Sequence, residues 1–351
     1  MSITDTSMLY PKITQHVSEV VKALRNLQNG RGDLNAHSVS QPVPIVGTVK
    51  LHGSHADILV YSDGRIVLQS KNVPSITKAN DNLGFASAMA DKTQAILNLR
   101  GQYIARWKEL NPDAVLDSKY PILMAGEWIG KSIQKHVAIS QLSRRFVIVS
   151  ANINGLWVDD IAYASIEAPS SSIYNISRAG IYQSILYPDD IARTLSEVEP
   201  LAEAVATICP FAAMFETHGE GEGIVWKPTS PQLLSNPNLW FKTKGGRFKP
   251  TFAPAQKQLP TAQQEKRDAA DAVSAIWCTE ERLQQGWDFL EEVGVPRDMK
   301  ALGRYLKWVQ SDIMVEERGY IEENETEEAM LRISIAKIAK VWYLEKVGRD
   351  L

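Results

Sequence analysis

The chain has 351 residues, a formal net charge of −3 and an ordinary globular composition, with 44% hydrophobic residues. This length predicts two domains or one large domain with an appendage. The charge excludes a global positive field, so any surface that attracts nucleic acid must be local. Two cysteines, Cys209 and Cys278, argue against a disulfide framework and a cysteine-built zinc site. Neither a membrane span nor a signal-peptide core is apparent, so we expect a soluble intracellular protein with no membrane partner.

The N-terminal part mixes helical and strand patterns. Apolar residues at helical spacing predict a helix over residues 8–28, which Gly30 ends. After a polar loop, an apolar strand ends at Lys50. Asp63-Gly64 then favours a tight primed turn in a hairpin. We expect the hairpin strands over 56–62 and 65–70, and a long helix over 85–110.

The rest of the chain changes character after Phe248, where a proline-bearing segment is typical of a linker. Before it, the patterns predict strands at 122–127, 145–151 and 157–166, and a helix at 189–208 that is interrupted or bent near Pro200. They also predict a strand broken by glycines at 219–228 and a strand with a turn at 239–248. After it, they predict helices at 262–275, 279–293, 297–318 and 326–347, with Thr279 and Thr326 near helix starts. We therefore predict an α+β domain over 1–248, a linker over 249–261 and an all-α domain over 262–351.

Charged side chains stand at the ends of several apolar strands, where core packing does not need them. They are Lys50, Lys71, Glu127, Glu222, Lys227, Lys242 and Lys244. Singly, each has an ordinary interpretation as a solvated strand-end charge. Together they suit a triphosphate bound with a divalent metal, because lysines balance phosphate charge and a carboxylate recruits Mg²⁺. Gly53 after Lys50 lets the backbone turn away from such a site.

The order of these blocks resembles the covalent nucleotidyltransferase superfamily of ATP-dependent ligases and mRNA capping enzymes. The blocks are KLHG, QSKN, GEWIG, FVIV, EGIVWKP and FKTK, within about residues 45–248. Within that superfamily, GEWIGKSIQKHV is similar to a segment of the RNA ligase branch that includes phage nick-sealing ligases and trypanosomal editing ligases, and WVDD also has a counterpart. The resemblance implies antiparallel sheets with flanking helices in the first domain.

Residue roles follow from this resemblance. It implies that Lys50 attacks the α-phosphate of ATP to form lysyl-AMP, that Glu127 contacts the ribose and that Glu222 holds the metal, Mg²⁺ or alternatively Mn²⁺. Lys242 and Lys244 would contact the α-phosphate and the departing pyrophosphate. The remaining positions implied to lie at the nucleotide are the backbone at Val49 and Leu51 beside adenine, and the side chains of His55, Lys71, Val149 and Lys227, the last as a phosphate or nucleic-acid contact.

Three positions depart from the pattern of that branch. His55 stands where asparagine or arginine is usual, and Lys71 replaces an arginine, which keeps the charge but loses the bidentate fork. Val149 stands where an aromatic residue commonly stacks on adenine. Because the other lysines and carboxylates are present, these departures indicate a divergent member of the family.

We therefore predict an ATP-dependent RNA ligase that joins 3′-OH and 5′-phosphate RNA ends in RNA repair or processing, and that acts as a monomer. The alternatives are a GTP-using guanylyltransferase of the capping type and an inert nucleic-acid-binding relative. Capping enzymes continue into a β-barrel, whereas this tail reads as helical. Nicked duplexes, tRNA halves and single-stranded ends are all compatible substrates.

For some other residues we expect a structural role, and for others two alternatives stay open. We expect His52 to shape the turn after Lys50, and Trp240 with Phe241 to belong to the core. His136 and His218 lack metal-ligand spacing. Glu220 competes with Glu222 for the metal role, and the EGIVWK register favours Glu222. In the tail, Arg297, Lys300, Arg304 and Lys307 are spaced for one basic helix face that would follow a phosphate backbone, or be merely solvated.

Overall fold

A computed structural model describes residues 9–30, 41–249, 263–324 and 326–349. The chain divides into two compact units, Met1–Lys249 and Pro250–Leu351, and each is described by itself. Most of the predicted linker, 249–261, lies outside the described residues.

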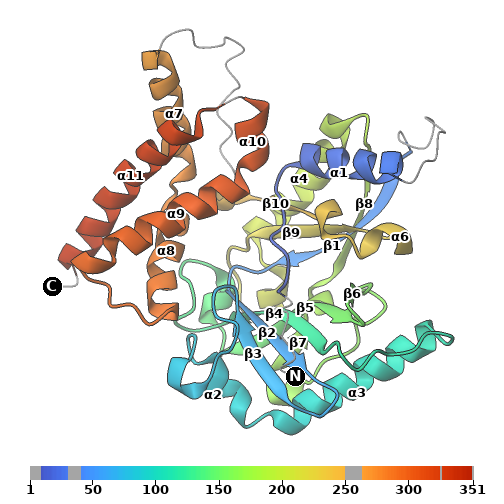
Figure 1. Cartoon of the computed structure of the whole chain (residues 1–351). Helices are drawn as coiled ribbons and strands as arrows, with labels where there is room; N and C mark the ends of the chain where they lie inside the picture. The colour runs from blue at the N-terminus through green and yellow to red at the C-terminus, as the bar shows by residue number, and fades with distance from the viewer. Residues whose placement is uncertain (1–8, 31–40, 250–262, 325, 350–351) are drawn as a thin grey trace. The chain divides into compact units, whose positions relative to one another are not determined.

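The first unit contains the mixed α and β elements (Figure 1). Its strands are β1 (Val43–Lys50), β2 (Ser54–Val60), β3 (Ile66–Ser70), β4 (Ile122–Ile129), β5 (Arg145–Ile153), β6 (Leu156–Trp157), β7 (Ile173–Asn175), β8 (Ile181–Leu186), β9 (Gly223–Pro228) and β10 (Phe241–Lys244). Its α-helices are α1 (Val17–Gly30), α2 (Phe85–Ala90), α3 (Thr93–Leu110), α4 (Ile191–Thr207), α5 (Pro210–Ala213) and α6 (Pro231–Leu234).

The strands form two sheets, and every neighbouring pair is antiparallel except β5 with β7. The first sheet has the order β10-β9-β1-β8, and the second has the order β3-β2-β4-β5-β6, with β7 also on β5. This arrangement confirms the α+β class with antiparallel sheets and flanking helices. In the first sheet, β1 therefore lies between β8 and β9, two strands that are far from it in the sequence.

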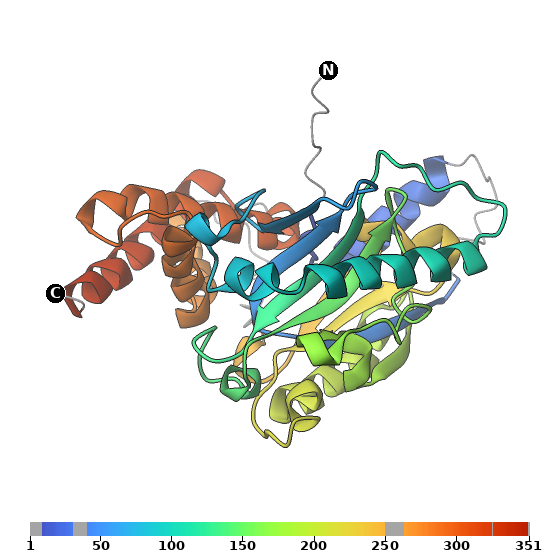
Figure 2. The same cartoon turned by 90° about the horizontal axis from the view of Figure 1, so that it is seen from below.

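Helices pack against both sheets, and buried apolar residues of the helices and of the sheets form the contacts. Leu99 and Tyr103 of α3 pack with Ile58 and Met124 of the second sheet, and Figure 2 shows α3 crossing that sheet. Residues of α1 and α4 pack instead in a cluster with the first sheet. Val147 of β5 belongs to this same cluster. The second sheet therefore contacts α3 on one face and the first sheet on the other.

Most predicted elements of this unit are present, but three details differ. Asp91 and Lys92 separate α2 from α3, where one helix was expected. The hairpin turn is a three-residue loop, in which Gly64 has a φ of 85° and its N–H donates to the carbonyl of Tyr61 (3.1 Å). The expected primed turn is therefore wrong. Pro200 lies inside a continuous α4, which begins at Ile191 and ends at Thr207.

The largest differences concern two strands. The predicted strand 157–166 is wrong after Trp157, because Asp159 caps a turn with its side chain accepting from the N–H of Ile161 (3.0 Å). Tyr163 and Ile166 are nevertheless buried with α3, which explains the apolar pattern. Conversely, the sequence reasoning missed β8, which pairs with β1. Its mixed apolar and polar residues are mostly half-exposed, so no strong alternation marks it.

The second unit is entirely helical where it is described. Its α-helices are α7 (Gln263–Trp277), α8 (Glu280–Glu292), α9 (Leu302–Glu316), α10 (Arg318–Glu323) and α11 (Glu328–Arg349). As predicted, Thr279 caps α8, with its hydroxyl accepting from the N–H of Arg282. A core of its own includes Trp287, Tyr305 and Tyr343. No helix among the described residues is long and apolar enough to cross a membrane.

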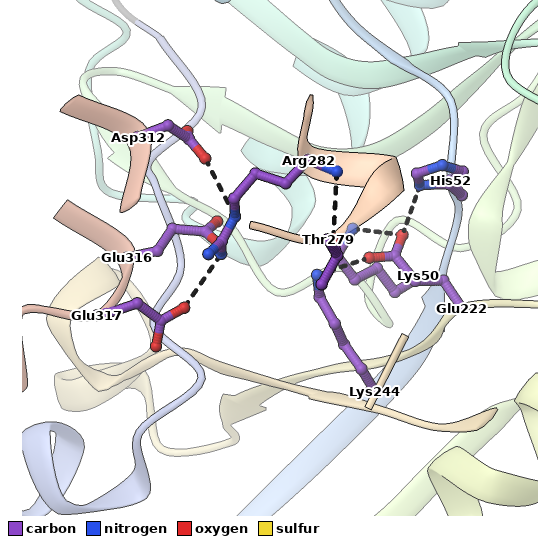
Figure 3. Close-up of polar contacts among 9 residues, drawn as sticks. All are labelled: Lys50, His52, Glu222, Lys244, Thr279, Arg282, Asp312, Glu316 and Glu317. Atoms are coloured by element: carbon purple, nitrogen blue, oxygen red, sulfur yellow. Dashed lines mark hydrogen bonds and ion pairs between the residues drawn. The ribbon is translucent and has the colours of Figure 1, made fainter. Parts of the chain in front are cut away.

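A buried ion-pair network joins three of these helices. The guanidinium of Arg282 on α8 contacts Asp312 and Glu316 of α9 and Glu317 at the start of α10 (Figure 3). Because all four side chains are at most 15% exposed, loss of the arginine would leave buried carboxylates uncompensated. The network therefore fixes these helices to one another.

Candidate active site

Three charged residues predicted from strand ends meet in the first unit (Figure 3). The Nζ of Lys50 lies 2.7 Å from Oε2 of Glu222, and the Nζ of Lys244 lies 3.2 Å from Oε1 of the same carboxylate. Glu222 is 2% exposed, whereas the two lysine side chains retain 22% and 19% exposure. The lysines can therefore reach a ligand in solvent while the carboxylate stays between them.

Strand register explains why these residues meet. Gly223, at the start of β9, is opposite Lys50 of β1 on one side and Lys244 of β10 on the other. A Cβ at Gly223 would lie 2.0 Å from the carbonyl oxygen of Thr243. Only glycine allows this close approach of the strands. The glycine after Glu222 thus brings both lysines to its carboxylate.

The charges around Glu222 determine its protonation state. Burial raises the pKa of this carboxyl, but Lys50, Lys244 and His52 outweigh burial and hold the pKa well below its usual range. The Nδ1 of His52 lies 3.6 Å from Oε2 of Glu222. We expected His52 only to shape the turn; its ring also contacts this carboxylate. Glu222 is therefore an anion throughout the physiological pH range.

The competing carboxylate, Glu220, has a different environment. Its side chain is 54% exposed and lies 2.8 Å from the guanidinium of Arg247. It makes no described ion pair with Lys50 or Lys244. Of the two carboxylates in GEGEG, Glu222 is therefore the one placed to serve the lysines.

A second acidic position lies on the neighbouring sheet. Glu127 on β4 is directly opposite His55 on β2 and Val147 on β5. Its Oε2 is shielded from solvent and has no hydrogen-bond partner among the described residues. Burial raises the pKa of Glu127 to about 7, against the opposing effect of Lys50 and His55. A buried acceptor without a donor is costly, so this atom is suited to a ligand hydroxyl.

His55 is held by a buried carboxylate that the sequence reasoning did not single out. The Nε2 of His55 lies 2.9 Å from Oδ2 of Asp57, and the same oxygen accepts from Gln69 (3.1 Å). Burial opposes the charged imidazolium, but Asp57 and Glu127 outweigh it and raise the pKa of His55. The alternation of β2, with His55 and Asp57 two residues apart on one face, was the signal available in the sequence.

Replacing Glu127 with glutamine should stabilise the protein at alkaline pH. The native carboxyl has a raised pKa of about 7, against an ordinary value of 4.5. The folded state then binds more protons than the unfolded state, so this residue's cost grows as the pH rises from 4.5 and is complete above 7. The glutamine variant should gain about 3 kcal/mol in free energy of unfolding at high pH, measured by urea denaturation. An equal gain near pH 5 would contradict the explanation.

Lys227, which the resemblance implied to be a phosphate or nucleic-acid contact, lies in the interior of the first unit. It is 3% exposed, and its Nζ lies 2.6 Å from Oδ2 of Asp160 and 2.9 Å from the hydroxyl of Ser150. The same atom lies 4.0 Å from the ring centroid of Trp240 and 5.6 Å from that of Tyr10. Burial lowers the pKa of Lys227 and raises that of Asp160. Because Lys227 is on β9 and Ser150 is on β5, their hydrogen bond joins the two sheets.

The sequence reasoning missed Asp160, Ser150 and Tyr10 as partners of Lys227. The Asp-Asp of WVDD was the available signal for Asp160, but the expectation of a strand there hid its turn. Tyr10 also packs against Trp157, with ring centroids 5.4 Å apart. Trp240 and Phe241 are fully buried, as expected for core residues.

The remaining predicted positions are divided between interior and surface. Lys242 is 7% exposed, Val49 and Leu51 are buried, Val149 is partly buried and Lys71 is exposed. Lys242 and Lys244 do alternate on β10, but only Lys244 makes a described ion pair with Glu222. The structure therefore brings Lys50, Glu222 and Lys244 together directly, with Glu127 and His55 on the facing sheet.

The predicted basic helix face of the second unit is wrong in part. Arg297 precedes α9, and its guanidinium lies 2.7 Å from Glu291 and 3.4 Å from Asp288. Lys300 lies in the 3-10 turn Met299–Ala301. The spacing misled because the helix begins only at Leu302.

The residues fit a divalent metal that arrives with a ligand. No described group of three His, Cys, Asp or Glu side chains could hold a metal ion alone. Mg²⁺ is typically bound through one or two carboxylates, while waters and substrate phosphates complete its coordination. The buried, ionised Glu222 meets that requirement, and the flanking lysines would balance phosphate charge.

The site thus consists of one buried carboxylate, Glu222, between the amines of Lys50 and Lys244, at one end of a four-stranded antiparallel sheet. The family model described as RNA ligase matches residues 43–244. The chain belongs to the RNA ligase family, which confirms the family predicted from the motif order. No curated protein matches this sequence.

Solved structures with similarity to this chain include RNA ligases of Naegleria gruberi. A point mutant with AMP and Mn is 15% identical, with a TM-score of 0.40, covering 68% of this chain and 56% of that one. Another mutant, with ATP and Mn, is 14% identical, with a TM-score of 0.42 and coverage of 69% and 56%. The ligase with PPi is 15% identical, with a TM-score of 0.40 and coverage of 70% and 60%. This chain therefore spans less than two thirds of those ligases.

Proposed function

We propose that this protein is an ATP-dependent RNA ligase that joins RNA 3′-OH and 5′-phosphate ends through lysyl-AMP. The observation that carries the proposal is the ionised Glu222 between Lys50 and Lys244. Membership of the RNA ligase family supports it. Such a cluster supplies a nucleophile, positive charge for phosphates and one carboxylate for a divalent cation.

In the first step, the neutral amine of Lys50 attacks the α-phosphorus of ATP. The ammonium first gives one proton to solvent; as the N–P bond forms and the P–O bond to pyrophosphate breaks, the nitrogen gives a second proton to solvent, which leaves the phosphoramidate. Glu222 stabilises the ammonium form in the free protein because the two groups are only 2.7 Å apart. A divalent cation at Glu222 would supply positive charge that favours the neutral amine and balances the phosphates. Lys242 and Lys244, two residues apart on β10, would contact the α-phosphate and stabilise the departing pyrophosphate.

Other residues would hold the nucleoside. The unpaired Oε2 of Glu127 would accept a ribose hydroxyl, and the backbone at Val49 and Leu51 would border adenine. Val149 would form the apolar wall beside it. His55 and Lys71 would supply positive charge near the ribose or phosphates. Lys227, which is hydrogen-bonded to Asp160 and Ser150, would contact a phosphate or the nucleic acid.

Two later steps would complete ligation. The RNA 5′-phosphate oxygen attacks the phosphorus of lysyl-AMP, which frees Lys50 and gives an adenylylated 5′ end. The RNA 3′-OH then attacks the 5′-phosphate, forms the phosphodiester and releases AMP. The helical second unit supports this function over mRNA capping, because capping enzymes continue into a β-barrel. The assembled lysine–carboxylate cluster argues against an inert relative.

The proposal is tested by incubating the chain with labelled ATP or GTP and Mg²⁺, followed by denaturing electrophoresis. We expect covalent label from ATP alone. Residues 1–249, which contain the whole cluster and cores of their own, should take up AMP equally well but seal nicked RNA at least about ten-fold more slowly. Stronger labelling by GTP would favour capping, and no labelling would favour an inert relative. A folded truncation that seals at the full rate would refute the role of the tail.

A further inference from the structure

The loop between β4 and β5 has a backbone conformation that is costly without glycine. Ser132, Gln134 and His136 have φ angles of 66°, 57° and 59°, whereas the alternating residues between them do not have positive φ. Left-handed conformations are uncommon for such residues, and a run of them marks a segment that its surroundings hold in place. Strain of this kind is concentrated at functional sites.

Alternating φ signs give the two sides of the loop opposite polarity. Such alternation turns successive N–H groups toward one side, which forms a concave site for an anion. The backbone N–H groups of Ser132, Gln134, Lys135 and His136 find no acceptor among the described residues. The carbonyls face a cation: the guanidinium of Arg247 donates to the oxygens of Lys135 (3.4 Å) and His136 (2.5 Å).

Hydrogen bonds hold the loop to the segment that follows Lys50 and to the segment that precedes Glu222. It begins after the strand that carries Glu127. The side chain of Gln134 donates to the carbonyl of Gly53 (3.4 Å), three residues after Lys50. At its end, the N–H of Ala138 donates to the carbonyl of Glu220 (2.9 Å), two residues before Glu222. The loop therefore lies at the rim of the site.

Exposed positive charge gathers on this rim. Lys131, Lys135 and Arg144 are exposed, and the Nε of Arg144 donates to the carbonyl of Lys131 (3.1 Å). Arg247 is the one cation of the group with a described carboxylate partner, Glu220, and that pair is at the surface. An exposed pair of this kind holds its partners weakly. Because these groups are exposed while the proposed nucleotide site is largely buried, a ligand longer than ATP fits them better.

We propose that the loop from Lys131 to His136 binds backbone phosphates of the RNA strand beside the end being joined. The inference rests on the proposed ligase function and names the surface that positions its RNA. The N–H groups of the loop would donate hydrogen bonds to one phosphate, and Lys131 and Lys135 would neutralise the charge of the adjacent phosphates. Contacts of this kind fix the register of a nucleic acid without reading its sequence.

The test measures binding of a fluorescent nicked RNA duplex to the full chain over a range of KCl concentrations. The double variant Lys131→Ala/Lys135→Ala should bind about ten-fold more weakly at moderate salt, and its log–log salt slope should shrink by about 1.5 because two phosphate contacts are lost. Its lysyl-AMP formation from ATP should stay near the wild-type rate. Gln134→Pro should weaken binding more than Gln134→Gly does: both variants lose the side-chain contact with Gly53, but only proline forbids positive φ and removes an N–H.

The matched control is Lys78→Ala/Lys108→Ala, which removes two exposed lysines elsewhere in the same unit and should leave affinity and slope unchanged. A loop variant with the wild-type affinity and slope would overturn the inference. Equal loss of lysyl-AMP formation would also overturn it, because the loop would then serve the ATP phosphates. A wild-type chain that neither labels with AMP nor binds the duplex would instead refute the proposed function, and the loop inference with it.

Discussion

Substituting alanine for Lys50 is expected to abolish covalent labelling by ATP. The amine is the nucleophile of the proposed first step, and the neighbouring Lys244 is engaged at the other oxygen of Glu222. Labelling should therefore fall to background, a loss on the order of 10³-fold or more. The measurement is uptake of labelled AMP by the full chain, quantified after denaturing electrophoresis.

The fold should survive this change, since Lys50 is 22% exposed and contributes little packing. Lys244 remains as a counter-charge for the buried carboxylate. Far-ultraviolet circular dichroism and the unfolding midpoint check this point. Lys108→Ala, on the exposed side of α3, serves as the control and should label like the wild type. Wild-type labelling in Lys50→Ala would remove this lysine from the nucleophilic role.

Replacing Glu222 with glutamine should give the second large loss, while Glu220→Gln should remain near wild-type activity. The first change removes the buried anion between Lys50 and Lys244 and with it the proposed carboxylate for the metal. The second alters a carboxylate that is 54% exposed and contacts only Arg247 among its described ion pairs. The initial rate of AMP uptake over a series of Mg²⁺ concentrations measures both effects. We expect a loss of about 10²-fold or more for Glu222→Gln.

The two variants also differ in expected stability. Without Glu222, two lysines and His52 would face one another with no anion between them, which we expect to cost about 2 kcal/mol. Loss of the surface pair at Glu220 should cost less than about 1 kcal/mol. An inactive Glu220→Gln beside an active Glu222→Gln would show that the fourth motif was placed in the wrong register.

Local patterns predicted the elements whose signals lie within a few residues. The hairpin strands β2 and β3, the strand ending at Lys50 and most helices of the second unit follow from periodicity. The helix predicted over 297–318 is instead a 3-10 turn followed by α9 and α10. Predictions failed where the sequence signal was weak, or where the same apolar pattern fits both a strand and a buried turn. No glycine or proline marks the break at Asp91 and Lys92. The half-exposed β8 lacks a clean alternation, and the apolar residues after Trp157 are buried through turns.

The sequence by itself determined the family, the α+β class and the inventory of lysines and carboxylates, because each depends on residue type and order along the chain. Only the tertiary structure decided how that inventory is used. Register across β1, β9 and β10 selects Glu222 over Glu220. Packing between sheets commits Lys227 to Asp160 and leaves Glu127 with an unpaired oxygen. These outcomes depend on distances and burial between segments remote in sequence, and local patterns do not encode them.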